Sequence, residues 1–295
     1  MIKRWLTNLG LLVLIAGIVA FLYLRPEPEQ DGPEVHEISD LKLADISRVQ
    51  IEFPTRAPVS FEKVDGYWHM TQPYKARANQ ATVQRIMSIV AASTTEKFPT
   101  EDLAKFGLDQ PKLKLKLDEH EFQFGTYNPV SSEQYVAYGD AVYLVSPTYS
   151  ETASIQPVEL IDKKPLKPTE KIAGFDFSRL EQWEDIRLNV DLVDGKWMVS
   201  AENANPNQDE MNEWLELSWL QSSARFVEPY TPNRNATYPS FEVKLEGGGK
   251  VHFDKIQEAP DLMLGRPDEG IIYRYPNDIG FAMLNPPVNI PKDEE

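Results

Sequence analysis

A five-residue motif occurs twice in the chain and constrains its fold more than any other feature. Val64-Asp65-Gly66-Tyr67-Trp68 returns 129 residues later as Val193-Asp194-Gly195-Lys196-Trp197. Aspartate-glycine between apolar or aromatic residues favours the tight turn of a β-hairpin. Each tryptophan is expected to anchor a core, because an indole buries a large apolar area. The chain is therefore predicted to contain one module built twice.

The first copy, expected over residues 46–150, is predicted to consist of strands around one helix. Apolar and polar residues alternate from Val49 to Phe53 and again from Val59 to Phe61, which is typical of half-buried strands. An apolar stripe at helical spacing predicts a helix over residues 79–92, with Asn79 as its N-cap. A lysine row then alternates with leucines on a later strand, and we interpret it as a solvated face rather than an anion-binding stripe. Its members are Lys112, Lys114 and Lys116.

The second copy, expected over residues 173–295, repeats this order. We interpret Ser178-Arg179-Leu180 as the counterpart of Ser47-Arg48-Val49 and predict a helix over residues 206–220. The match drifts between Gly247 and Gly265, which we interpret as an insertion containing three acids: Asp254, Glu258 and Asp261. Further on, Gly280–Pro286 is expected to parallel the strand at Ala141–Pro147.

The predicted fold class is α+β, with an N-terminal transmembrane helix followed by two tandem, duplicated modules of mostly antiparallel sheet with one main helix each. Residues 151–172, which hold three prolines among lysines, are predicted to be the connector. Two paired modules leave an interdomain groove between them, and such a groove is the default place for a ligand.

The first 25 residues are predicted to be a membrane anchor. No charged residue occurs from Trp5 to Leu24, and 20 helical residues match a hydrocarbon core of about 30 Å. The basic residues Lys3 and Arg4 precede the span and acids follow it, which predicts a cytoplasmic N-terminus and extracytoplasmic, periplasmic C-terminal domains. A cleaved signal peptide is the alternative, but Ile18 fits its cleavage site poorly. Residues 26–45, rich in proline and acids, are predicted to form a stalk.

Composition excludes several functions. The 46 acids exceed the 30 lysines and arginines, giving a net charge of −16, so the surface repels nucleic acid and no nucleic-acid partner is expected. The simplest role of this charge is solubility, although a cationic partner is an alternative. Without cysteine the chain has no disulfide, no thiol nucleophile and no cysteine metal site.

No catalytic, cofactor-binding or metal-binding residue is predicted, and binding residues are not assigned. None of the four histidines has a partner at the helical spacing used by zinc enzymes; they are His36, His69, His120 and His252. The spacing of Asn203, Asn205 and Asn207 imitates a calcium loop but lacks its glycine and its final acid. Ser60 and Lys63 have a Ser-x-x-Lys spacing but should face opposite sides of a strand. Acid pairs such as Asp254 with Glu258 are expected to be solvated surface.

The pattern resembles a known family. The residues that carry it are the hairpin at Val64–Trp68, the helix at Asn79–Ala92, the segment Phe106-Gly107-Leu108-Asp109-Gln110-Pro111 and Tyr143-Leu144-Val145. Together they resemble the bacterial domain-of-unknown-function family DUF4340, best over residues 46–150 and more loosely in the second copy. Ala236-Thr237-Tyr238-Pro239 replaces the glycine-containing turn in that copy. The resemblance implies an association with gliding-type ABC exporter systems and brings no catalytic residues.

The leading hypothesis is a single-pass protein of the bacterial inner membrane that acts as an extracytoplasmic accessory or scaffold subunit. It would contact a polytopic ABC-type transport complex, need no cofactor and not be an enzyme. Two alternatives use the interdomain groove. One is a hydrolase of an envelope glycan or peptide, which a pocket of converging carboxylates with pKa values pushed apart would favour. The other is a binding module for a small solute.

Overall fold

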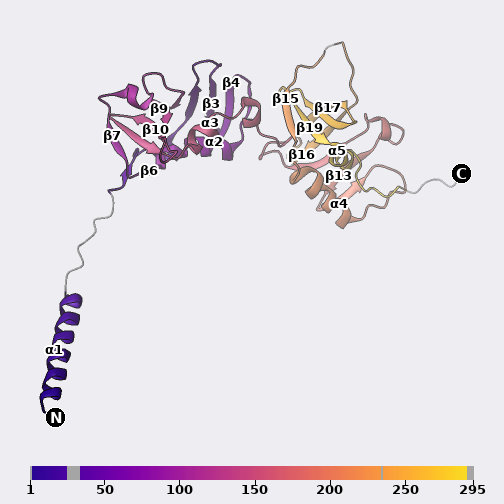
Figure 1. Ribbon diagram of the computed structural model, residues 1–295. Coiled ribbons are helices and arrows are strands. Elements are labelled where there is room, and N and C mark those ends of the chain that lie inside the picture. Colours follow the sequence, from indigo (N-terminus) through magenta and orange to yellow (C-terminus); the bar gives the residue numbers. More distant parts are fainter. Residues whose placement is uncertain (1, 25–33, 234, 291–295) are drawn as a thin grey trace.

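The computed structural model describes residues 2–24, 34–233 and 235–290 of the 295-residue chain. It is an α+β protein whose strands form two large antiparallel sheets, with a few short helices against them (Figure 1). The fold class predicted from the alternating apolar pattern is confirmed at this level. The strand period of two, repeated through both halves of the sequence, is the physical reason for it.

The first sheet has nine strands. Their order across the sheet is β5 (Ala76–Arg77), β4 (Tyr67–Gln72), β3 (Val59–Val64), β2 (Arg48–Glu52), β8 (Leu113–Leu117), β9 (His120–Tyr127), β10 (Gln134–Tyr138), β11 (Ala141–Val145) and β7 (Lys97–Pro99). On its buried side lies α2 (Gln80–Met87), continued by the 3₁₀ turn η2 (Ser88–Ala91) and packed against α3 (Thr148–Ala153). The helix predicted over residues 79–92 is confirmed, and the Asn79 side chain caps it by accepting the N–H of Thr82.

The second sheet has eight strands. Their order is β14 (Lys196–Val199), β13 (Asn189–Val193), β12 (Ile172–Asp176), β16 (Ser240–Leu245), β17 (Lys250–Gln257), β18 (Asp261–Arg266), β19 (Ile271–Pro276) and β15 (Phe226–Pro229). The helix α4 (Gln208–Trp214) runs on into a π-helical stretch, η6 (Leu215–Leu220). A further helix, α5 (Asn277–Leu284), lies against β18 and β19.

Apart from β5, the two sheets have the same strand order. Starting from the hairpin that carries the repeated motif, β4-β3-β2-β8-β9-β10-β11-β7 in the first sheet corresponds to β14-β13-β12-β16-β17-β18-β19-β15 in the second. The helix of each half follows the same strand, since α2 follows β4 and β5 while α4 follows β14. Both Asp65 and Asp194 take a left-handed backbone conformation at the hairpin turn, as do the glycines that follow them.

The correspondence corrects several details of the predicted second copy. The counterpart of β2 is β12, which begins at Ile172, so the match of Ser178-Arg179-Leu180 to the first copy is wrong; these residues lie in the loop after β12. The predicted insertion at 247–265 is also wrong, because β17 and most of β18 occupy it. The match drifted because the turns differ in length: the β16–β17 turn is longer than the β8–β9 turn, and the next turn is shorter. The segment Gly280–Pro286 lies mostly in helix α5 rather than in a strand, so that parallel is wrong too.

The segments joining these parts are more ordered than the sequence predicts. Part of the predicted stalk is folded, since β1 (His36–Glu37) pairs with β6 (Ser93–Thr94), Ile38 is buried and Leu43–Asp45 forms the 3₁₀ turn η1. The predicted connector contains the end of α3 and the 3₁₀ turn η4 (Pro157–Leu160). Short 3₁₀ turns also occur at Leu103–Phe106 (η3) and Glu181–Trp183 (η5). Buried apolar residues of both sheets form one continuous cluster.

The N-terminal helix α1 spans Ile2–Leu24. Within the part of the chain that the structure describes, no helix is both long enough and apolar enough to cross a membrane. The side chains described in α1 are those of residues 9–21. The side chains at both ends of the predicted anchor, residues 2–8 and 22–24, and the whole of residues 25–33, which include the first part of the predicted stalk, therefore lie outside what the structure describes.

Candidate functional site at the junction of the two sheets

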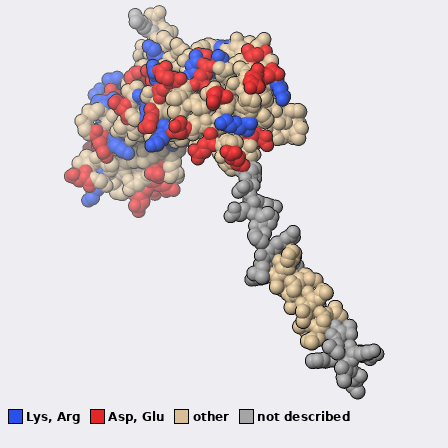
Figure 2. Space-filling view, turned by 90° about the vertical axis from the view of Figure 1, so that its left-hand side faces the viewer, with Lys and Arg blue, Asp and Glu red and all other residues tan. Residues whose placement is uncertain are grey.

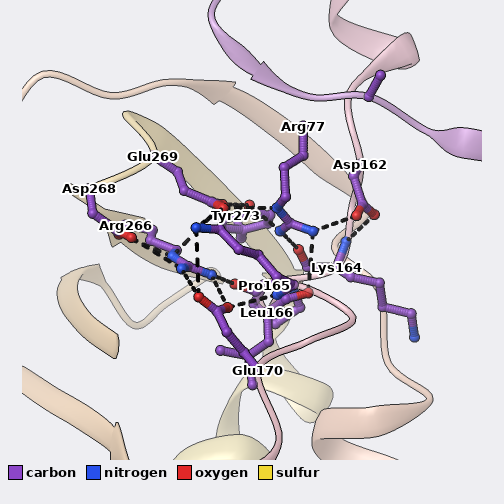
Figure 3. Close-up of polar contacts among 12 residues, drawn as sticks. Arg77, Asp162, Lys164, Pro165, Leu166, Glu170, Arg266, Asp268, Glu269 and Tyr273 are labelled. Carbon is purple, nitrogen blue, oxygen red and sulfur yellow. Dashed lines mark hydrogen bonds and ion pairs between the residues drawn. The ribbon is translucent and has the colours of Figure 1, made fainter. Parts of the chain in front are cut away.

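The two halves meet in a buried network of charged side chains. Arg77 comes from β5 of the first sheet, Arg266 and Tyr273 from the second sheet, and Asp162 and Glu170 from the connector (Figure 3). Asp268 and Glu269 lie in the turn between β18 and β19. The sequence predicted a groove between the two modules, whereas in the structure arginine–carboxylate ion pairs occupy the centre of this region.

Arg77 of the first sheet binds both to the connector and to the second half. Only 8% of its side chain is exposed, and every guanidinium nitrogen has an acceptor. The acceptors are Glu269 Oε1 (2.8 Å), Asp162 Oδ2 (2.5 Å), the carbonyls of Leu166 (3.2 Å) and Lys164 (2.5 Å), and Tyr273 Oη (3.1 Å). These five contacts match the five N–H donors of a guanidinium. All N–H donors of Arg77 are therefore used within the protein, and none is left for a ligand.

Arg266 is fully buried, and all of its N–H donors also have acceptors within the protein. It makes a bidentate pair with Glu170 at 2.6 and 2.8 Å and a second pair with Asp268 at 3.0 and 3.1 Å. Its remaining donor is bound by the Pro165 carbonyl at 2.7 Å. Glu269 links the two arginines, because it accepts from Arg77 and lies 3.7 Å from the Arg266 guanidinium.

The junction shifts the pKa values of its carboxyl groups in opposite directions. Burial raises the pKa of Asp162, and the Arg77 charge offsets this only in part. Burial is also the largest single influence on Glu170, but the hydrogen bonds from Arg266 and the Lys167 main chain, together with the charges of Arg266 and Lys167, outweigh it and hold the pKa of that carboxyl below its usual range. The pKa of the Asp268 carboxyl is likewise lowered: burial raises it, but the hydrogen bond and charge of Arg266 and the charge of Lys167 together outweigh burial.

Converging carboxylates with pKa values pushed apart are the pattern that would favour a hydrolase. In this network, however, the arginines hold the carboxylates in direct ion pairs. Of the carboxylates that bind Arg77, only Asp162 borders open space, with 22% of its side chain exposed. The geometry therefore joins the halves of the molecule and leaves few groups free for a substrate.

Two pockets flank the network. One, of about 310 Å³, lies between the first repeated hairpin and the connector, with Tyr67, His69 and Lys167 among its lining residues. The other, of about 480 Å³, lies between the connector and the π-helical stretch, with Leu215 and Trp219 in its wall. Asp162 and Lys167 line both. These pockets are what remains of the predicted interdomain groove.

The connector also fixes the helix of the second half. The Lys164 ammonium donates to three successive main-chain carbonyls at the end of η6: Leu220 (2.8 Å), Gln221 (2.6 Å) and Ser222 (2.9 Å). A cation is favoured there because the carbonyls of a helix C-terminus lack partners within the helix. Burial lowers the pKa of Lys164.

The residues considered for chemistry in the sequence do not assemble. His120 contacts Tyr138, and His252 contacts Asp254 at 3.1 Å. Asp254 accepts from Tyr230, whereas its proposed companion Glu258 pairs with Lys255. Among the described residues no group of His, Asp and Glu side chains could hold a metal ion.

Two other sequence patterns have structural roles. Asn207 of the calcium-like segment is the N-cap of α4, as Asn79 is of α2. Lys114 and Lys116 of the lysine row pair with Glu121 and Glu52 on the solvated face of the strand. Figure 2 shows acidic and basic side chains interspersed over the visible face rather than gathered into a single patch.

The repeated motif has a structural role. The sequence predicted its buried tryptophans but not the glutamine that binds each of them. Trp68 and Trp197 are both buried core residues, as predicted. In each half a glutamine clamps the main chain of this tryptophan: Gln80 accepts its N–H (2.8 Å) and donates to its carbonyl (3.0 Å), and Gln208 does the same at 2.7 and 3.1 Å. The signal that could have revealed it is an Asn-Gln pair, which follows the motif in both copies.

Comparison with known proteins gives a family. No curated protein matches the chain, and no solved structure does. A family model matches residues 68–239, from the first buried tryptophan to the residue before β16, so the match begins later than the resemblance over residues 46–150 and continues through the connector into the second half. It covers more than half of the 295 residues, and the chain therefore belongs to the family described as Domain of unknown function (DUF4340).

Proposed function

We propose that this protein is a membrane-anchored, extracytoplasmic scaffold or accessory subunit that acts through protein contacts. The observation that carries the proposal is the junction itself: Arg77 joins the first sheet to the connector and the second sheet, and Arg266 fixes the connector to the second sheet. Two connected sheets of nine and eight strands offer long surfaces to a partner. Duplication of one ancestral module accounts for the shared strand order.

The proposed anchor is residues 1–25. The proposal rests on the sequence, because the described side chains of helix α1 are those of residues 9–21 only. The stretch from Trp5 to Leu24 is free of charge, and its 20 residues at about 1.5 Å each would extend about 30 Å in a helix. The basic residues Lys3 and Arg4 precede this stretch. We place the N-terminus in the cytoplasm and residues 34–290 outside the cytoplasmic membrane. A reporter that is active only in the periplasm, fused after Glu295, tests this topology; a silent fusion together with an active cytoplasmic reporter would contradict it.

The proposed partner is a polytopic subunit of an ABC-type transport complex. Resemblance to the family supports this choice, and the acidic surface with 46 acids suits a protein rather than a nucleic-acid partner. The full chain, tagged at its C-terminus, should co-purify from detergent-solubilised membranes with a transporter permease after cross-linking. The matched control is a chain in which a heterologous membrane helix replaces residues 1–25, which should retain the permease if the folded domains make the contact. Recovery of neither permease nor ATP-binding subunit from the native chain would refute the proposal.

A second candidate function is binding or hydrolysis of a small envelope glycan or peptide fragment at the junction. One observation favours it: Asp162, whose pKa burial raises, lines both flanking pockets. Envelope fragments should then raise the melting temperature of the native chain but not of Asp162→Asn. Equal shifts in both proteins, or none in either, would remove this candidate.

A further inference from the structure

The two sheets differ at one edge, although their strand order is otherwise the same. In the first sheet, β4 is covered by the added strand β5, which pairs His69 with Arg77 and Met70 with Ala76. In the second sheet, β14 is the last strand, and no strand of the described residues pairs with its outer side. An uncovered strand edge presents unpaired main-chain groups and can accept a further strand.

The open edge has a defined register. The main-chain groups of Trp197 point away from β13, because Gln208 binds both of them. Main-chain direction alternates along a strand, so the N–H and carbonyl of Val199 point the same way. Val199 corresponds to Met70, the residue that β5 pairs with in the first half. The unpaired position is thus the one already used for strand addition in the other copy.

The glutamine clamp does not block strand addition. In the first half the Trp68 carbonyl accepts from Gln80 at 3.0 Å and from the Ala78 N–H at 3.0 Å at the same time. The equivalent Trp197 carbonyl is bound by Gln208 and has room for the same second donor by analogy with Trp68. The first half therefore shows that clamp and added strand coexist.

The loop after β14 leaves the strand edge open because it forms a turn instead of running along β14 as a further strand. Residues 200–206 occupy the place in the sequence that residues 73–78 occupy in the first half. In the second half the Ala204 N–H bonds back to the Ala201 carbonyl, and the Asn205 N–H bonds to the Asn289 carbonyl. The loop is thereby held against the C-terminal segment. Met198 beside the edge is 57% exposed.

Charge indicates what kind of segment would fit. The strand on the first edge is basic, since Lys75 precedes it and Arg77 belongs to it, and the adjacent helix α2 contains no acid. The helix beside the open edge is acidic instead. Gln208 and Asn212 of α4 face β14 through hydrogen bonds to Trp197, and Asp209 and Glu213 follow them on the helix surface, exposed.

We propose that the outer edge of β14 binds an extended, basic segment of a partner protein as an additional antiparallel strand. The segment would place a small residue opposite Val199, a lysine or arginine opposite Met198, and further basic residues near Asp209 and Glu213. A second copy of this chain is disfavoured because its net charge is −16. The inference rests on the proposed role as a protein-contact subunit and names the surface and the partner chemistry for it.

The probe is a synthetic peptide with the sequence of residues 71–79, which contains the strand that covers the first edge. It is titrated into the full-length chain in detergent, and hydrogen exchange is followed at the Val199 amide. Binding should slow exchange at this amide. Val199→Pro should weaken binding by about tenfold or more, because proline removes the N–H that the added strand needs. Val199→Ala is the matched control, and it should bind within about twofold of the native chain because it keeps that N–H.

A modified peptide provides a test on the native chain, which does not depend on whether the proline variant folds. N-methylation of the peptide residue that corresponds to Ala76 should abolish protection of the native Val199 amide. Asp209→Asn combined with Glu213→Gln should weaken binding and reduce its dependence on salt. The proposal is overturned if the peptide binds without protecting Val199, if it does not bind at millimolar concentration, or if Val199→Pro instead converts a dimer of the native chain into a monomer. The co-purification experiment is independent of this outcome, so the role and the edge can fail separately.

Discussion

At the scale of single residues, the side chains that define this protein act on main-chain groups. Gln80 and Gln208 each bind both main-chain groups of a buried tryptophan, as a neighbouring strand would. Without Gln208 both main-chain groups of Trp197 would need another partner at the edge of the sheet, whereas without Gln80 only the Trp68 N–H would, because the Trp68 carbonyl also accepts the Ala78 N–H. This explains why one glutamine follows each copy of the hairpin motif.

We expect Gln208→Ala to lower the free energy of unfolding by about 1–3 kcal/mol, because two main-chain groups of Trp197 lose their partner. Urea unfolding followed by tryptophan fluorescence measures the change. The exposed residue Glu213 on the same helix supplies the control, since Glu213→Ala should change stability by less than about 0.5 kcal/mol. Equal effects of the two substitutions would mean that the clamp is not what stabilises the edge.

At the scale of elements, α5 ends in an unusual cap. Three indole N–H groups donate to three successive carbonyls near its C-terminus: Trp214 to Ala282 (2.6 Å), Trp219 to Met283 (3.2 Å) and Trp183 to Leu284 (2.8 Å). These carbonyls lie in the last turn of the helix, where the α-helical pattern supplies no partner. The indoles satisfy them and also pack α5 against the sheet and η6.

Replacing Trp219 by phenylalanine should keep most of the apolar volume but leave the Met283 carbonyl without its donor. We expect a loss of stability of about 1–3 kcal/mol, from the missing hydrogen bond and the smaller ring. Thermal unfolding with a stability curve would measure it. Phe281→Ala on the same helix is the comparison, because that ring is 62% exposed and its removal should have little effect. A larger loss in Phe281→Ala than in Trp219→Phe would contradict this role of the indole.

At the scale of the whole molecule, the charged junction connects the two similar sheets through Arg77 and the connector. Arg266 pairs with Glu170 of the connector deep inside, where an unpaired charge would be strongly unfavourable. Since the folded-state pKa of Glu170 is lowered, its stabilising contribution is present above its unfolded pKa of about 4.3 and is lost as pH falls through the folded value.

Glu170→Gln should therefore destabilise the protein at pH 7 by about 3–5 kcal/mol and flatten its loss of stability on acidification. Denaturant unfolding at a series of pH values from about 7 down to about 3 tests both effects. Glu119→Gln, at a surface ion pair with Arg48, should leave the pH dependence unchanged. Parallel pH curves for the native chain and Glu170→Gln would show that the junction does not carry this acid sensitivity.

Local sequence determined much of the architecture. Alternation of apolar residues, the Asp-Gly turns and the asparagine caps require only neighbours along the chain, so the strands, both hairpins and the positions of α2 and α4 could be predicted from them. The repeated tryptophans were predicted correctly as core residues for the same reason. The alignment of the second copy with the first was wrong where the turns between corresponding strands differ in length. The alternating pattern shows that a segment is a strand, but it does not show which strand of the other copy it corresponds to.

Only the tertiary structure decided the junction and the edges. Arg77, Asp162 and Arg266 are far apart in the sequence and have no local pattern, so their meeting depends on how the two sheets pack. Strand β5 and the turn at residues 200–206 occupy equivalent positions in the two copies, yet one covers its sheet edge and the other turns toward Asn289. Hydrogen bonds to distant segments made that choice. The sequence alone thus determined the repeated module, and long-range packing determined which surfaces of the two copies are closed and which remain open.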